Sequence, residues 1–482
     1  MLISAILILP LQAQIPDTSW TKTFGGSEAD YGRQVQQTSD GGYIIFGFTN
    51  SFGAGMQDIY LIKTDSIGNL EWEKTYGTNN TECGESGRQV ADGGYIILAT
   101  TSDAPFKDDA YLLKVNSSGD TIWSKRYGGS GQDMVREVQQ TTDLGYIFVG
   151  FTGSFGPGIL YGPNVYLVKT DSLGNQLWYR AYGDTTWDMG FSVQQTADGG
   201  YIIAGITDYF HYDTCDVYLI KTDANGDTVW SKTYGGSGED YGERVRQTSD
   251  GGYIIVGESN SFGAGDYDIY VIKTDSLGNI QWTRTYGGQQ DDCSMDVKEI
   301  PGRGYIIVGI TASFGAGDYD VYLVRIYSNG DTVWTKTIGG SQTEYGRSIC
   351  ITNDNGYIVC GETSSYGAGA LDVYLIKIEP DTLGINMDKD TRVHKAIEFR
   401  ALSPQREYIS VQYHLPRRCD VRIDIFDVSG SRLRTLTKEG ERSGFHSMVL
   451  RTDQYGVEIS SGVYFVAFKA QNFFEVKKVV LV

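Results

Sequence analysis

Residues 230–279 read WSKTYGGSGEDYGERVRQTSDGGYIIVGESNSFGAGDYDIYVIKTDSLGN, and the pattern of this stretch recurs along most of the chain. It combines a tryptophan, a glycine-rich acidic loop, an Asp-Gly-Gly-Tyr turn and two apolar runs. Successive copies are separated by 52, 51, 55, 52, 52 and 52 residues, with leading tryptophans at Trp20, Trp72, Trp123, Trp178, Trp230, Trp282 and Trp334. Seven copies of a unit of about 50 residues indicate a solenoid, an array or a propeller.

Each copy contains four short strand candidates bounded by turn residues. In the first copy these are Arg33–Thr38, Tyr43–Thr49, Ile59–Thr64 and Leu70–Thr75. The sequence Asp40-Gly41-Gly42 suits a tight hairpin, because glycine adopts positive φ angles without steric cost. No segment has a sustained 3.6-residue apolar period, so we expect few helices.

The four strands of a copy differ in polarity, and this difference predicts their order. The second and third strands are apolar on both faces, so their sheet must be covered on both sides. The first strand is mostly polar, as expected beside water in a central channel, and the fourth alternates like a half-exposed outer strand. An open sheet of 28 strands is excluded, since twisted sheets rarely exceed about 10 strands. The sequence therefore predicts an all-β fold, a seven-bladed β-propeller.

The two ends of the repeat region predict how the propeller closes. The last copy supplies Ser348–Thr352, Tyr357–Gly361 and Val373–Ile378, but no tryptophan strand follows. The first copy begins with a tryptophan strand that has no partner, Trp20–Phe24. We therefore expect the N-terminal strand to complete the seventh blade and remove its exposed edge.

Composition limits the partners of this chain of 482 residues. Charged residues make up 21%, aromatic residues 13%, and there are 62 glycines, which suits a turn-dense all-β protein rather than disorder. The formal net charge is −20, which argues against nucleic acid and anionic membrane surfaces as partners.

The ends of the chain differ from the repeats. Residues 1–14 contain a short apolar run followed by Pro10 and are interpreted as a signal peptide; the alternative is a disordered apolar N-terminus. No other segment is long enough to span a bilayer, so we do not expect an integral membrane protein. The propeller is assigned to residues 15–379, a linker to 380–395, and a small immunoglobulin-like β-sandwich of seven short strands to 396–482.

Motifs in the C-terminal segment carry a resemblance to known families; they are residues 421–430, 432–436, 461–465 and 477–482. They resemble the C-terminal sorting domain of type IX secretion substrates and the immunoglobulin-like domain of flagellar hook-assembly proteins. The resemblance covers about one sixth of the chain, and Ser403-Pro404-Gln405 stands where Asn-Pro-Phe is usual. It implies export by outer-membrane secretion machinery and a secreted or cell-surface location. The repeats resemble Asp-Gly-Gly-Tyr-type repeats of secreted bacterial proteins, a resemblance that implies no activity.

Two polar positions recur in every copy, and blade topology places both on one face. One follows the tryptophan by ten residues: Asp30, Glu82, Asp133, Asp188, Asp240, Asp292 and Glu344. The other precedes the third strand: Asp58, Asp109, Asn164, Asp216, Asp268, Asp320 and Asp372.

These acids have a functional and a structural interpretation. Asp30, Asp133, Asp240 and Asp292 are candidate oxygen ligands for a hard cation such as calcium, or part of a carboxylate-lined mouth. The structural interpretation is that they accept backbone N–H bonds and pin the turns, and pair with nearby bases. A base recurs in each apolar third strand, as at Lys63, and needs a carboxylate partner. We favour the structural interpretation and expect no other cofactor.

Departures from the repeat are better candidates for a binding site. Loops of copies three and four carry aromatic residues beside carboxylates, which a sugar or peptide site uses. The alternative is that these side chains pack the loops. The candidate ligand-binding residues are Trp187, Tyr161, Tyr209, Phe210, His211, Tyr212 and Asp188.

Motifs for nucleophilic, metal-hydrolase and phosphate-loop chemistry are missing from the sequence, and only His211 among four histidines lies in the repeats. We therefore expect a non-catalytic binding or adhesion protein that recognises an extracellular glycan or protein. The alternatives are a secreted glycoside hydrolase or lyase using carboxylates of one face, and a structural surface-layer component.

Overall fold

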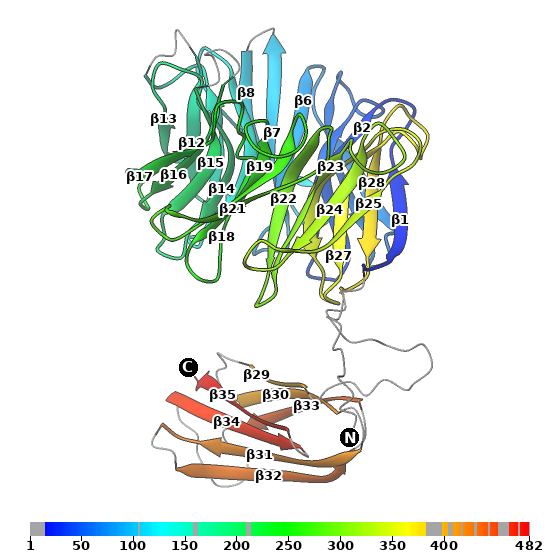
Figure 1. Cartoon of the computed structure of the whole chain (residues 1–482), viewed down its shortest axis with the longest axis vertical. Coiled ribbons are helices and arrows are strands. Elements are labelled where there is room, and N and C mark those ends of the chain that lie inside the picture. Colours follow the sequence, from blue (N-terminus) through cyan, green and yellow to red (C-terminus); the bar gives the residue numbers. More distant parts are fainter. Residues whose placement is uncertain are drawn as a thin grey trace, which may run out of the picture. The chain divides into compact units, whose positions relative to one another are not determined.

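In the computed structural model, all secondary-structure elements assigned within the described residues are β-strands (Figure 1). The chain divides into two compact units, residues 1–384 and residues 385–482. Within the described residues, no helix has the length and apolarity needed to cross a bilayer. The described residues are 15–104, 107–157, 162–208, 214–381, 398–402, 408–415, 418–428, 431–441, 444–451, 462–470 and 473–481.

The first unit contains seven four-stranded antiparallel sheets, which form a β-propeller. The first four sheets are β2 (Asp30–Gln37), β3 (Tyr43–Thr49), β4 (Asp58–Thr64), β5 (Leu70–Tyr76); β6 (Thr81–Gln89), β7 (Tyr95–Ala104), β8 (Lys107–Val115), β9 (Thr121–Tyr127); β10 (Asp133–Gln140), β11 (Tyr146–Thr152), β12 (Asn164–Thr170), β13 (Gln176–Tyr182); and β14 (Met189–Gln195), β15 (Tyr201–Thr207), β16 (Asp216–Thr222), β17 (Thr228–Tyr234). The other three are β18 (Arg244–Gln247), β19 (Tyr253–Ser259), β20 (Asp268–Thr274), β21 (Ile280–Tyr286); β22 (Asp292–Ile300), β23 (Gly304–Thr311), β24 (Asp320–Ile326), β25 (Thr332–Ile338); and β26 (Glu344–Ile351), β27 (Tyr357–Thr363), β28 (Asp372–Ile378), β1 (Thr18–Phe24).

Burial along these strands confirms the predicted strand order within a sheet. Every residue of β3 and β4 is buried, because neighbouring sheets cover both faces. Strand β5 contains only exposed and half-buried residues, and β2 contains buried and half-buried residues. The core therefore lies between facing sheets; one such layer contains Ile44, Phe46, Leu61, Tyr95 and Ile97.

The N-terminal strand pairs with the last repeat, as predicted. Strand β1 runs antiparallel to β28, with Trp20 opposite Lys377 and Phe24 opposite Val373. The first and last sheets also touch directly, because Asp30 N donates to Leu371 O over 2.8 Å. The last sheet thus takes its fourth strand from the start of the chain.

Glutamines at the end of the inner strands link one sheet to the next. The backbone N–H of Ser39, in the first hairpin turn, donates to Gln89 Oε1 of the second sheet over 2.9 Å. The same bond joins the last sheet to the first, since Asn353 N donates to Gln37 Oε1 over 2.8 Å. Between the sixth and the last sheet, Pro301 of the sixth sheet has no N–H to donate, and Ile351 of the last sheet stands where the accepting glutamine would be.

The second unit contains two sheets. One has the order β29 (Glu398–Leu402), β30 (Tyr408–Leu415), β33 (Gly444–Arg451); the other has the order β32 (Arg432–Glu441), β31 (Cys419–Phe426), β34 (Gly462–Ala470), β35 (Phe473–Leu481). Val411, Ile423, Ile425, Val466 and Phe468 are buried in a common core. The seven described strands match the number predicted for this segment.

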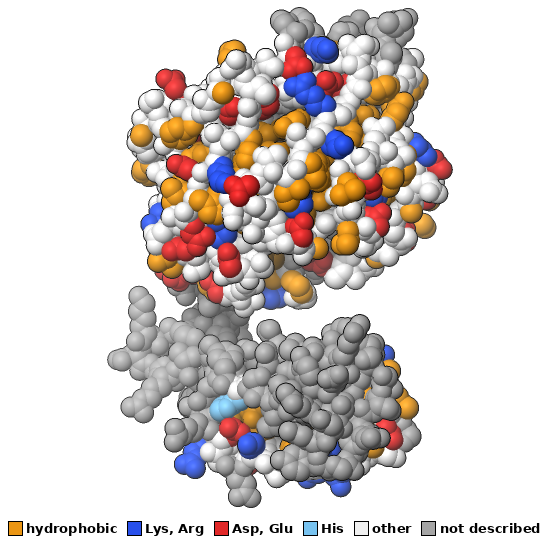
Figure 2. Space-filling view, turned by 180° about the vertical axis from the view of Figure 1, so that it is seen from behind, with side chains coloured by type: hydrophobic (Ala, Val, Ile, Leu, Met, Phe, Trp, Pro, Cys, Tyr) orange, Lys and Arg blue, Asp and Glu red, His pale blue; other side chains and the backbone are white. Residues whose placement is uncertain are grey.

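Figure 2 shows one face of the first unit, where acidic, basic and apolar side chains are interspersed. Exposed apolar side chains on the first unit include Leu70, Leu177 and Ile280, all on outer strands. Single apolar residues of this kind are normal on a protein surface and indicate no site.

Candidate functional site

A β-bulge interrupts the inner strand of six of the sheets at an equivalent position. In the first sheet Gly32 pairs with Gly47 and Gln34 pairs with Phe46, so Arg33 is the extra residue without a cross-strand partner. Bulges bend a strand and redirect one side chain. In the fifth sheet the equivalent residue, Glu243, lies just before β18. The bulge residues of the other sheets are Glu85, Arg136, Phe191, Met295 and Arg347.

A glycine in the second strand makes room for the bulge. A Cβ on Gly47 would lie 1.8 Å from Tyr31 O, and one on Gly257 would lie 1.8 Å from Tyr241 O. A side chain at these glycines would push the two strands apart in their present positions. Equivalent glycines occur in all sheets but the second, where Ala99 takes the place.

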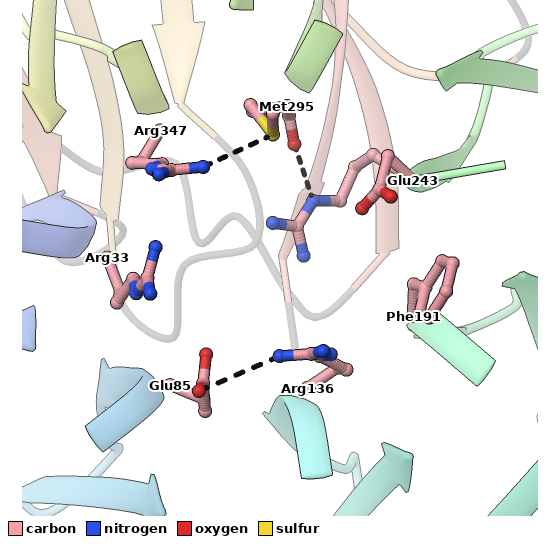
Figure 3. Close-up of a pocket in the computed structure, with 8 residues that line it drawn as sticks. Arg33, Glu85, Arg136, Phe191, Glu243, Met295 and Arg347 are labelled. Carbon is pink, nitrogen blue, oxygen red and sulfur yellow. Dashed lines mark hydrogen bonds and ion pairs between the residues drawn. The ribbon is translucent and has the colours of Figure 1, made fainter. Parts of the chain in front are cut away.

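The seven equivalent side chains meet in one cavity of about 260 Å³, which we call the central pocket. Figure 3 shows them entering from strands on several sides, with the guanidinium groups of Arg33, Arg136 and Arg347 near the open middle. The pocket is lined by Arg33, Glu85, Arg136, Phe191, Glu243, Arg244, Met295 and Arg347. Four arginines and two glutamates thus line the pocket, and Glu362 and Glu137 behind it pair with three of the arginines.

The arginines of the central pocket differ in how fully they are paired. Arg347 Nε lies 3.0 Å from Glu362 Oε2, whereas Arg33 Nη1 lies 3.7 Å from Glu362 Oε1. Arg136 Nη1 has one carboxylate contact in the pocket, to Glu85 Oε1 at 3.7 Å, and its side chain is 37% exposed. The buried Nε of Arg33 has no hydrogen-bond partner among the described residues. The exposed guanidinium group of Arg136 therefore keeps N–H donors for a ligand, whereas the Nε of Arg33 is buried away from the pocket.

A buried carboxylate organises the layer next to the pocket. Glu137 is fully buried and lies 3.1 Å from Arg88 Nη2, 3.3 Å from Arg244 Nη1 and 2.8 Å from Arg246 Nη2. Burial alone would raise the pKa of Glu137, but these three arginines offset it and hold that pKa well below its usual range. Glu137 also accepts from the backbone N–H of Val193 in the next sheet, over 3.0 Å. Arg244 is thus held in place, rather than left free for a ligand.

Burial affects the pocket carboxylate Glu243. Burial raises the pKa of Glu243, and the arginines that line the pocket only partly oppose this effect. A carboxyl group of this kind can donate as well as accept hydrogen bonds.

The recurrent acids act within their own loops, as the structural interpretation predicted. Asp30 is fully buried; its Oδ2 accepts from Gly26 N and from Ser51 Oγ, each over 2.7 Å, and its Oδ1 accepts from Thr49 Oγ1. The other three candidate metal ligands, Asp133, Asp240 and Asp292, make the same contacts with a glycine N–H and a serine hydroxyl. All four lie in different sheets. Among the described residues, no three His, Cys, Asp or Glu side chains gather in a metal-like group.

The two acid positions approach each other in pairs between neighbouring sheets. A Cβ on Gly235 would meet Asp216 Oδ1 at 1.9 Å and Asp240 Oδ2 at 2.7 Å, so this glycine separates the two carboxylates. Burial and Asp240 together raise the pKa of Asp216. In copies three and four the pair is Asn164 and Asp188, which replaces one acid by an amide. Most members of these pairs are buried, and Asp109 and Asp216 are half-buried, so the pairs do not form an open carboxylate-lined mouth.

The bases of the third strands have the carboxylate partners that the sequence required. Lys273 is 3% exposed and lies 3.0 Å from Asp250 Oδ2, in the Asp-Gly-Gly-Tyr turn. Its Nζ also donates to Thr274 O over 2.9 Å. In the sixth sheet Arg303 occupies the turn, and the buried Arg325 instead pairs with Asp381 at 2.9 Å, beyond the end of β28. In the other six sheets the aspartate of the turn is thus an ion-pair partner as well as a turn residue, a role that the sequence pattern did not predict.

Only part of the predicted aromatic site lies within the described residues. Trp187 is half-buried, and its indole packs so close to Gly162 that a Cβ there would lie 2.1 Å from Trp187 Cδ1. Asp188 is 1% exposed and its Oδ2 accepts from Asp184 N over 3.1 Å. Burial raises the pKa of Asp188 to about 6. Tyr161, Tyr209, Phe210, His211 and Tyr212 lie outside the described residues, so their role as ligand contacts stays a prediction.

Sequence reasoning missed the central pocket, although a signal was present. The glycine inside an otherwise apolar second strand, as in Tyr43-Ile44-Ile45-Phe46-Gly47, is typical of a bulge opposite. The extra residue at the bulge of the inner strand can then be compared between the seven copies. The side chains at that position differ in charge and size from copy to copy: they are Arg33, Glu85, Arg136, Phe191, Glu243, Met295 and Arg347.

Comparison with known proteins finds a relative that matches over part of its length, and several solved structures with low sequence identity. No protein-family model matches the chain. The regulatory protein FlaEY of Caulobacter vibrioides is 27% identical over 202 residues, which cover 37% of this chain and 21% of FlaEY, so the match spans about a fifth of that relative.

Solved structures similar to this chain include the β-propeller domain of the Trilobed protease from Pyrococcus furiosus (11% identity, TM-score 0.42, 76% of this chain and 98% of that one). They also include a protein of unknown function from Dyadobacter fermentans (9% identity, TM-score 0.41, 76% and 99%) and a puromycin hydrolase mutant (10% identity, TM-score 0.46, 80% and 59%). None of these carries an activity over to this chain.

Proposed function

We propose that this chain is a non-catalytic binding protein that takes its ligand in the central pocket. The observation that carries this proposal is the pocket itself, where one side chain from each of seven repeated sheets meets in a cavity of about 260 Å³. The surrounding strands repeat closely, whereas the seven side chains differ in charge and size. A scaffold needs no such variation, but the recognition of one particular ligand does.

The proposal includes the finer architecture and the location of the protein. The seven sheets are the blades of one closed propeller, in which β1 completes the last blade. The second unit is an immunoglobulin-like sorting domain that directs the chain through outer-membrane secretion machinery to the cell surface. There the propeller recognises an extracellular glycan or protein. The paired β1 and β28 and the motifs of residues 421–482 support these statements.

A pocket-filling substitution tests where binding occurs. The full chain is screened for binding on an array of bacterial and plant glycans and on extracellular proteins of its native cells. Met295→Trp fills the central pocket and should abolish binding of any captured ligand, whereas Met295→Leu preserves the volume and should bind normally. Equal binding by both variants would show that the ligand sits elsewhere, as on the loops around Trp187.

Glu243 favours one second candidate, a secreted glycoside hydrolase or lyase. A carboxyl group whose pKa is raised by burial, facing a second carboxylate across a cavity, is the kind of pair that such enzymes use. Product release from the captured glycan, lost in Glu243→Gln, would establish this alternative. Binding without any turnover supports the non-catalytic function.

A further inference from the structure

We infer that the ligand of the central pocket is an acidic sugar, a saccharide whose carboxylate is bound by Arg33, Arg136 and Arg347. This inference rests on the proposed binding function and specifies its ligand. It follows from three properties of the pocket: unsatisfied guanidinium donors, carboxylates that can accept from hydroxyl groups, and an apolar wall.

The three arginines have donors left over after their contacts with the protein. Arg33 and Arg347 share one carboxylate, Glu362, so two positive charges face one negative charge. Arg347 Nη1 has only a thioether partner within the pocket, Met295 Sδ at 3.9 Å, and sulfur is a weak acceptor. A carboxylate ligand would offer the strong, paired acceptors that guanidinium groups favour.

Fixed aromatic and acidic neighbours hold these arginines toward the cavity. The guanidinium carbon of Arg347 lies 4.7 Å from the ring centre of Tyr345, and that of Arg33 lies 5.2 Å from the ring centre of Phe48. Such stacking restricts a long side chain and lowers the entropy lost on binding. The anion site is therefore largely formed before the ligand arrives.

The remaining lining suits a sugar ring better than an inorganic anion. Glu85 and Glu243 offer hydrogen-bonding oxygens to the hydroxyl groups of a sugar, and an inorganic anion such as sulfate has no hydroxyl groups to use them. Phe191 and Met295 supply an apolar wall; Phe191 is only 9% exposed and packs on Ile206, so its position is fixed. A cavity of about 260 Å³ lies just below the range of roughly 300–1,000 Å³ typical of ligand sites, which suits a single sugar residue.

Isothermal titration of the full chain with sodium glucuronate, glucose and sodium sulfate tests the inference. Glucuronate should bind at least tenfold more tightly than either glucose or sulfate. Arg136→Gln should weaken glucuronate at least tenfold, and Arg136→Lys should recover only part of the loss because lysine cannot form two parallel bonds. Arg284→Gln removes the same charge from an exposed outer strand and should change nothing.

Several outcomes would overturn the inference. They are equal affinities for glucuronate and glucose, tighter binding of sulfate than of glucuronate, or an unchanged glucuronate affinity in Arg136→Gln. The array with Met295→Trp keeps the two proposals apart. A neutral ligand lost in Met295→Trp but unaffected in Arg136→Gln would leave the binding function standing and refute the acidic sugar.

Discussion

Two positions occur once in every sheet of the first unit, yet they have opposite characters. One position is the basic residue of the third strand. It is a buried lysine paired with an aspartate in six of the seven sheets, and it is Arg325 paired with Asp381 in the remaining sheet. At the bulge of the inner strand, the sheets carry arginine, glutamate, phenylalanine and methionine. A repeated contact is one that every sheet needs for stability, whereas a position that varies on a constant backbone is free to recognise a ligand.

The largest effect is expected in the sixth sheet, where the pair of Arg325 and Asp381 stands in place of the lysine–aspartate pair of the other sheets. Asp381→Ala removes the partner of Arg325, and both side chains are essentially unexposed. Leaving a buried charge unpaired costs about 3–5 kcal/mol. All 8 tryptophans lie in the first unit, so its unfolding in urea can be followed by tryptophan fluorescence of the full chain. A loss below about 1 kcal/mol would mean that Arg325 is held by backbone carbonyls alone.

The next largest effect is a pH dependence of the free energy of unfolding, caused by the buried Asp188. Asp188 has a pKa raised to about 6 from 3.8, so the folded state binds its proton more tightly than the unfolded state. Its contribution to stability is full below about pH 4 and is lost as the pH rises through about 6. Relative to Asp188→Asn, the wild type should therefore lose about 2 kcal/mol between pH 4 and pH 7.5.

Urea unfolding of both proteins at each pH measures this difference. Asn164 across Gly183 is already neutral, so only Asp188 titrates within the pair, while Asp184 and Asp208 nearby add to the raised pKa of Asp188. Parallel pH profiles for the two proteins would contradict the raised pKa.

A smaller effect is expected for an ordinary copy of the repeated ion pair. Asp250→Ala leaves Lys273 without its carboxylate, but the aspartate is 54% exposed and water can approach the ammonium group. We expect a loss of about 1–2 kcal/mol, less than for a fully buried pair because solvent screens the interaction. If Asp250→Ala destabilised the unit as much as Asp381→Ala, exposure would not be what separates the two pairs.

The smallest effect is expected at the contact between the last and first sheets. Gln37→Ala removes the acceptor for Asn353 N, and one hydrogen bond contributes about 0.5–1.5 kcal/mol. The matched control is Gln247→Ala, which removes the same bond to Ala197 N between two sheets that are consecutive in the chain. Similar losses are expected, since each variant breaks one such bond. No loss in Gln37→Ala would indicate that the first and last sheets separate in solution.

The sequence was sufficient to predict the strands of each sheet, their order and the pairing of Trp20–Phe24 with the last repeat. Those predictions rest on local signals, namely apolar runs, turn residues and a fixed period. It also predicted that the recurrent acids pin their own loops. The ion pair between Arg325 and Asp381 was beyond such reasoning, because it joins the third strand of the sixth sheet to the segment that follows β28 of the last sheet.

The central pocket could not be predicted for a similar reason. Arg33 and Arg136 are ordinary polar residues in their own copies, and only the arrangement of sheets brings them to one cavity. Alternation along the strand also misleads here, since a bulge shifts the register by one residue and changes which side chain faces inward. A comparison of copies position by position would have shown the variation, although not its place in space.

The most direct test of the account is a crystal structure of the full chain with glucuronate. The account predicts the sugar in the central pocket, with its carboxylate within hydrogen-bond distance of Arg33, Arg136 or Arg347 and its hydroxyls toward Glu85 and Glu243. Glucuronate on the outer strands or on the loop of Trp187, with the pocket holding only water, would contradict it.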